Sequence, residues 1–126
     1  MSRYLLDTSA IIWYLRGRED ARRIISDIKT ASVPGCSALS LLEIVVGERK
    51  TERQATREFL AALRVIPVHR REATLAGELI KDFLARGFTL DVIDAVIGAT
   101  CLIHDLVLVT YNPKHFPLSD LKLYPM

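Results

Sequence analysis

The chain has 126 residues, of which half are hydrophobic and a quarter are charged, with 6 glycines and 5 prolines. This length and balance are typical of one compact domain, which we expect to span residues 1–126, and they exclude disordered, collagen-like and low-complexity chains. No apolar run approaches the roughly 20 residues of a membrane span. An acid follows the first two leucines, so a signal peptide is not expected either.

Charge is distributed unevenly along the chain, although the net charge is only +2. Residues 1–71 hold 13 Lys/Arg and 8 Asp/Glu, a net of +5, whereas residues 72–126 hold 4 and 7, a net of −3. A basic half is compatible with an anionic partner, but such runs are most often solvated faces. The two cysteines, Cys36 and Cys101, lie in apolar surroundings. They predict buried free thiols in a reducing cytoplasm.

Short apolar runs alternate with longer helical patterns. In chain order, the expected elements are a strand over 4–6, a helix over 8–16 capped by Thr8 or Ser9, a helix over 19–29, a weak strand over 33–36, a helix opened by Ser37 or Ser40, a helix over 51–63, a strand over 65–68, helices over 72–86 and 91–104, and strands over 106–109 and 121–124. This alternation predicts a layered α/β fold with a mainly parallel sheet. Ligands of such sheets collect at the carboxyl ends of the strands.

Three acids stand where burial would normally exclude a charge. Asp7 directly follows an apolar strand, while Glu43 and Asp94 each interrupt an apolar helical run. A buried carboxylate costs several kcal/mol unless it finds a partner. No Lys or Arg lies within the helical turns next to Asp94, and none lies closer to Glu43 than Arg49, so compensation must come from elsewhere in the fold or from a bound cation.

Each acid also has an ordinary structural interpretation. Asp7 is a suitable helix N-cap, and Glu43 fits an exposed position on a helix with a wide apolar face. Asp91 precedes Asp94 by three residues, the spacing of a capping box, so Asp94 fits the third position of that box. Asp91 itself is better explained as a cap than as a ligand. The three explanations are less satisfactory together than singly, because Asp7 and Asp94 both flank predicted strand–helix corners.

Four segments at their spacings resemble the PIN domain, and within it the toxin ribonucleases of the VapC type. They are Tyr4 to Ser9, then Ser37 with Glu43 and Gly47, then Asp94 to Thr100, and finally Leu108 to Phe116. The resemblance covers essentially the whole chain. It implies a three-layer α/β/α fold with a central, mainly parallel sheet of about five strands. A response-regulator receiver domain is disfavoured, because no expected strand between residues 33 and 68 ends in Asp.

The resemblance also implies a metal-dependent endoribonuclease whose principal acids are Asp7, Glu43 and Asp94. Carboxylates without a Cys or His ligand pair suit Mg²⁺ or Mn²⁺. We expect Asp7 and Asp94 to ligate the ion directly and Glu43 to act through water. Thr8, Ser9, Ser37, Thr110 and Asn112 are expected behind these acids or at the RNA phosphate. His115 is a candidate general base, although a plain turn residue is the better explanation.

Asn112 occupies a position where the family often has a fourth acid. A neutral amide there weakens the case for a second tightly held ion, and Asp91 is a possible partial replacement. Asn112 also keeps open an alternative function, a PIN-like module that binds RNA or a protein and cleaves weakly or not at all.

The resemblance implies three partners: an RNA substrate, a VapB-type antitoxin that blocks the site, and a second copy of the chain in a homodimer. Two basic clusters are candidates to attract RNA phosphates. They are Arg16, Arg18, Arg22 and Arg23, and Arg49, Lys50, Arg53 and Arg57. Neither cluster contains aromatic residues at base-stacking spacing, so the sequence indicates no readout of RNA by stacking.

Overall fold

The fold comes from a computed structural model that describes residues 2–126. Its elements in chain order are β1 (Tyr4–Leu6), α1 (Thr8–Leu15), α2 (Glu19–Ala31), β2 (Gly35–Ser37), α3 (Ala38–Gly47), the short 3-10 helix η1 (Lys50–Glu52), α4 (Arg53–Ala61), β3 (Arg64–Ile66), α5 (Arg70–Ala85), α6 (Val92–His104), β4 (Val107–Val109) and the 3-10 turn η2 (Pro113–His115). Every strand except the last expected one is found within two residues of its predicted place.

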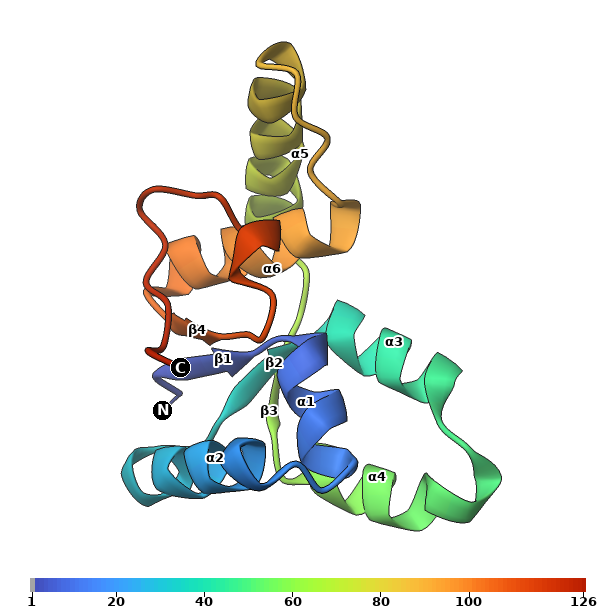
Figure 1. Ribbon diagram of the computed structural model, residues 1–126. Coiled ribbons are helices and arrows are strands. Elements are labelled where there is room, and N and C mark those ends of the chain that lie inside the picture. Colours follow the sequence, from blue (N-terminus) through green and yellow to red (C-terminus); the bar gives the residue numbers. More distant parts are fainter. Residues whose placement is uncertain (1) are drawn as a thin grey trace.

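The strands form one sheet in the order β3-β2-β1-β4, and each neighbouring pair is parallel. Figure 1 shows α1, α2 and α4 on one side of this sheet, with α6 on the other side and α5 beyond α6, extending away from the sheet. The predicted α/β/α layers and parallel sheet are therefore confirmed. The parallel arrangement places the ends of β1, β2 and β4 at one edge, immediately before Asp7, α3 and Thr110.

Alternate strand residues supply the two cores, because successive side chains of a strand point to opposite faces. Leu6 and Val109 pack with the buried residues of α1 to α4. Leu5 and Leu108 pack against α6 on the other face, where Ile97 is buried. A third cluster joins α6 to α5, so apolar residues that were predicted on both helices pack against each other.

The expected fifth strand, over residues 121–124, is wrong. This segment makes one isolated parallel bridge, between Leu123 and Leu108, so the sheet has four strands. The Leu108 N–H donates to the Lys122 carbonyl, and the Tyr124 N–H donates to the Leu108 carbonyl.

Both cysteines are buried and free, as the sequence predicts. Burial raises the pKa of the Cys36 thiol to about 11, which leaves it protonated and unreactive at neutral pH. Within residues 2–126, none of the helices has the length and apolar character needed to cross a bilayer.

A buried carboxylate, that of Glu72, ties the start of α5 to the end of α6. Its side chain is 1% exposed, and its two oxygens accept from the His69 N–H at 2.9 Å and contact His104 Nε2 at 2.8 Å. Burial pushes the pKa of Glu72 upward, but hydrogen bonds from His104 and from backbone N–H groups outweigh it. The pKa therefore lies below its ordinary value.

We expect Glu72→Gln to lower the free energy of unfolding by about 1–3 kcal/mol at pH 7, because it removes a buried charge-assisted hydrogen bond. The stabilisation by ionised Glu72 is present above the ordinary pKa of 4.5 and is lost as pH falls through the lower folded value. Urea unfolding at pH 7 and at acid pH measures the effect. Glu78→Gln, an exposed glutamate on the same helix, is the matched control, and equal losses in both variants would contradict the role of Glu72.

Candidate metal and phosphodiester site

Asp7 lies where β1 ends, and its carboxylate holds the first turn of α1. Oδ1 accepts from the Ala10 N–H at 2.9 Å and from the Ser9 hydroxyl at 2.6 Å, while Oδ2 accepts from the Thr110 hydroxyl. Asp7 is thus the N-cap of α1, which confirms the structural interpretation of this residue and corrects the expectation of a cap at Thr8 or Ser9. Its extended backbone places the carboxylate over the free N–H groups of the first turn.

The Asp7 carboxylate is only 4% exposed. Burial raises its pKa, the hydrogen bonds from Ser9, Thr110 and Ala10 lower it, and the net pKa lies above the ordinary value. The Asp7 N–H also donates to the Val109 carbonyl at 3.1 Å, which fixes this corner to β4. An ionised Asp7 therefore has a fixed position, and a cation bound beside it would compensate its charge.

Glu43 projects from α3 and is half-buried. Its Oε1 accepts from the Thr8 hydroxyl at 2.5 Å, and Thr8 Oγ1 also lies 3.1 Å from the Ser40 hydroxyl. Ser37 caps α3 by accepting from the Leu39 N–H at 3.1 Å, so the helix that carries Glu43 starts at the first of its two candidate serines. Ser40, buried beside Thr8, is a member of this network that the sequence marked only as a possible cap.

Asp94 lies in the first turn of α6, where Asp91 is the N-cap. The Asp91 carboxylate accepts from the backbone N–H groups of Ile93 and Asp94 at 3.0 and 3.2 Å, which confirms the cap as its better explanation. Asp94 Oδ2 lies 3.5 Å from Nδ1 of His115, an exposed residue of η2. The predicted neighbourhood of His115 and the acids is therefore present.

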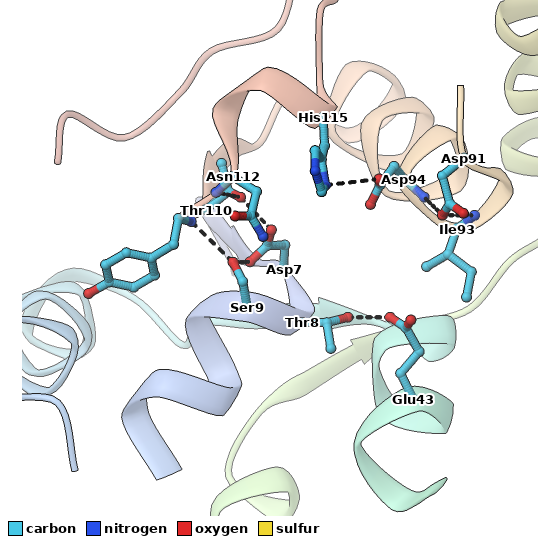
Figure 2. Close-up of polar contacts among 11 residues, drawn as sticks. Asp7, Thr8, Ser9, Glu43, Asp91, Ile93, Asp94, Thr110, Asn112 and His115 are labelled. Carbon is cyan, nitrogen blue, oxygen red and sulfur yellow. Dashed lines mark hydrogen bonds and ion pairs between the residues drawn. The ribbon is translucent and has the colours of Figure 1, made fainter. Parts of the chain in front are cut away.

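The acids act on one another electrostatically. Burial raises the pKa of Asp94, the charges of Asp91, Asp7 and Glu43 raise it further, His115 lowers it, and the result is about 6. Figure 2 shows Asp7, Asp94 and Glu43 coming from three different elements around a common region. The sequence separates these residues widely, and the parallel sheet with its helix starts brings them together.

Two hydroxyl groups behind Asp7 order the loop after β4. Thr110 Oγ1, which donates to Asp7, accepts from the Asn112 N–H at 2.9 Å. Ser9 Oγ, which also donates to Asp7, accepts from the Tyr111 N–H at 3.1 Å. The Asn112 side chain is exposed beside this network (Figure 2).

The carboxylates of Asp7, Glu43 and Asp94 lie around one region, but they are too far apart for all three to bind one metal ion together. Within residues 2–126, no group of three His, Cys, Asp or Glu side chains is close enough to hold a metal. In the same part of the chain, no Lys or Arg forms an ion pair with Asp7, Glu43 or Asp94. The available oxygen donors fit a hard cation such as Mg²⁺, which commonly takes one or two carboxylates and keeps several waters.

Aromatic residues near the acids are the main feature that the sequence missed. The Tyr111 ring lies 6.5 Å from the Trp13 ring, centroid to centroid, and the Arg18 guanidinium lies 4.3 Å from the Tyr111 centroid. The expectation of no stacking surface was drawn from spacing within each basic cluster. The fold brings Tyr111 to Arg18 from the other end of the chain, and this contact could not be recognised from that spacing.

The sequence profile of the PIN domain matches residues 4–118. Among curated proteins, Ribonuclease VapC10 of Mycobacterium tuberculosis is 31% identical over 116 residues, which cover 92% of this chain and 87% of that protein. Ribonuclease VapC19 of the same organism is 29% identical, with 90% and 92% covered.

Solved structures agree with these relatives. A toxin-antitoxin complex from Klebsiella pneumoniae contains a chain with a TM-score of 0.83 and 27% identity, and the match covers 98% of both chains. The DNA-bound VapBC of Salmonella typhimurium matches with a TM-score of 0.86 over 98% of both chains, and at 21% identity it supports the fold alone. The chain therefore belongs to the PIN domain family, and within that family to the VapC ribonucleases.

Proposed function

We propose that this protein is a divalent-metal-dependent endoribonuclease and the toxin of a VapBC-type toxin–antitoxin pair. The observation that carries the proposal is the arrangement of Asp7, Glu43 and Asp94 around one region (Figure 2), where no Lys or Arg in residues 2–126 pairs with them. The pKa of Asp94, raised to about 6, agrees with this arrangement. Family membership supplies the reaction class, and the acids supply the chemistry that hydrolysis of a phosphodiester needs.

Asp7 and Asp94 are the residues proposed to hold Mg²⁺ or Mn²⁺ directly. When bound, such an ion supplies positive charge that stabilises the developing phosphate oxyanion and acidifies a water. Asp7 is held for this task by Ser9, Thr110 and the start of α1. Asp94 is held at the start of α6. The neighbouring carboxylates make its surroundings negative, which favours the binding of a cation.

Glu43 is proposed to orient the attacking water. Thr8 occupies its Oε1, so Oε2 is the oxygen left to accept from that water. Ser37 contributes by fixing the start of α3, and a contact between Ser37 and phosphate remains a prediction. Asn112 and His115 lie on the exposed side of the acids, where we place the RNA phosphate and its leaving oxygen.

The two basic clusters are proposed to attract RNA. One lies around the turn from α1 to α2, and the other continues from η1 into α4. Their arginines and lysines supply positive charge for the RNA phosphates, so RNA binding is expected to weaken steeply as the salt concentration is raised.

The antitoxin is the proposed protein partner, since a structural relative is part of a toxin-antitoxin complex. A cavity of about 360 Å³ lies beside Glu43, between α1, α3 and η1, and its lining includes Ile12, Leu15 and Ile44. A partner segment seated there would cover the approach to Glu43. This position accounts for inhibition by occlusion.

We expect a homodimer in the absence of antitoxin. Apolar side chains of α3 lie on the surface, with Val46 79% exposed and Leu42 54% exposed, and such a patch favours self-association. Light scattering at micromolar concentration should give a dimer for the wild type and a monomer for Val46→Asp, which leaves the core untouched. A monomeric wild type would contradict this expectation.

Asp7→Asn and Asp94→Asn should each reduce RNA cleavage by at least about 100-fold, because each removes a proposed metal ligand. Cleavage is measured on a labelled RNA with Mg²⁺ or Mn²⁺, and circular dichroism confirms that the variants are folded. Asp27→Asn, at an exposed position on α2, is the control and should cleave normally.

Undiminished cleavage by either site variant would refute the ligand assignment. Wild-type protein that binds RNA but cleaves it at no Mn²⁺ concentration would favour the alternative of a binding module.

Asp94→Asn should also stabilise the metal-free protein at pH 7, by about 1–2 kcal/mol after allowance for partial exposure. A raised carboxyl pKa in the folded state means that ionised Asp94 costs stability at neutral pH. The cost disappears as pH falls below the ordinary value of 3.8.

Thermal unfolding with EDTA and with excess Mg²⁺ or Mn²⁺ measures the effect. The cation should stabilise the wild type more than Asp94→Asn, and an equal gain in both would count against Asp94 as a ligand.

A further inference from the structure

Trp13, Tyr111 and Arg18 form a partly exposed aromatic surface, which is called here the Trp13 platform. Trp13 is 37% exposed, and its ring meets Tyr111 edge to face at 62°. The Arg18 guanidinium lies over both rings, 5.2 Å from the Trp13 centroid and 4.3 Å from the Tyr111 centroid. Arg16 lies over Trp13 as well, at 5.8 Å.

The platform is attached to the site through one hydroxyl group. Ser9 Oγ donates to Asp7 Oδ1 and accepts from the Tyr111 N–H, so Tyr111 is held by a residue that also holds a proposed metal ligand. Tyr111 also follows Thr110, the other side chain that donates to Asp7. The backbone of Tyr111 is therefore fixed to the residues that hold Asp7, while its ring lies against Trp13 and Arg18.

The platform is also pre-ordered. Arg18 Nε lies 2.7 Å from Asp20 Oδ1, which fixes the plane of the guanidinium. The neighbouring aromatic of α1 has a different role, because Tyr14 stacks on buried Phe59 at 4.3 Å and belongs to the core. Trp13 is the more exposed of the two aromatic side chains of α1, because Tyr14 is partly covered by this packing.

We propose that the Trp13 platform binds an unpaired nucleobase of the RNA substrate, next to the phosphate that is cleaved. Flat apolar rings and a guanidinium plane are the surfaces on which proteins stack single-stranded bases. The surrounding arginines complement the RNA phosphates. The inference rests on the proposed ribonuclease function and deepens it, since a platform of this kind selects single-stranded or looped RNA over a duplex whose bases are already stacked.

The chain offers a direct test because Trp13 is its single tryptophan. In an Asp94→Asn background, a single-stranded RNA of about ten nucleotides should quench Trp13 fluorescence, because a stacked base contacts the indole. An abasic ribose-phosphate chain of the same length carries the same charge and should not quench it. Equal quenching by both chains would overturn the proposal in favour of purely electrostatic binding.

Substitutions then measure the contribution of the ring. Trp13→Leu keeps an apolar side chain and removes the aromatic face, so affinity for the RNA should fall by roughly 5- to 100-fold, the range expected for one stacked base. Trp13→Phe should restore most of it. Phe88→Leu, at a similarly exposed aromatic of 41% exposure that packs on Phe83, is the matched control and should bind normally.

The outcomes separate this proposal from the function on which it rests. Wild-type protein that fails to cleave RNA refutes the ribonuclease assignment, whatever the fluorescence shows. Wild-type cleavage combined with unchanged KM and RNA affinity in Trp13→Leu refutes the platform and leaves the ribonuclease intact. Weaker antitoxin binding with normal RNA affinity in Trp13→Leu would reassign the surface to the protein partner and would also overturn the proposal.

Discussion

The Asp7 carboxylate is buried, pairs with no basic side chain in residues 2–126, and is held instead by Ala10, Ser9 and Thr110. These three hydrogen bonds join the end of β1, the start of α1 and the loop after β4 at one point. The parallel sheet makes this possible, since β1 and β4 are neighbours and end at the same edge. The other acids are placed relative to this fixed point by the starts of α3 and α6.

Local patterns in the sequence were sufficient to predict the layered fold and to single out the candidate acids. Asp7 was recognisable because it directly follows an apolar strand, Glu43 and Asp94 because each interrupts an apolar run, and Asp91 because of its cap spacing. Contacts across the fold were not recognisable: Thr110 on Asp7, His104 on Glu72, and Tyr111 beside Trp13 all join distant segments. The fifth strand failed because the apolar segment over residues 121–124 makes only one isolated bridge to β4, and an apolar pattern does not show how far a segment pairs.

The site is arranged at the expense of stability. Asp91 caps α6 and in doing so places a negative charge near Asp94, while Asp7 and Glu43 add two more. A domain selected for stability alone would relieve this repulsion with a lysine or arginine. No lysine or arginine in residues 2–126 relieves the repulsion, which is consistent with a centre that takes its countercharge from a bound cation. The ionisation of the acids is then coupled to the binding of that cation.

The short strand β3 forms one edge of the sheet, and its outer side has no strand partner within residues 2–126. Exposed edges are where one chain recruits another into intermolecular sheets, as in amyloid. This edge is three residues long, begins with exposed Arg64, and is followed directly by Pro67, which lacks the N–H that a further ladder would need. Arg64 and Pro67 therefore make the folded protein a poor template for fibril growth, even when many copies accumulate side by side.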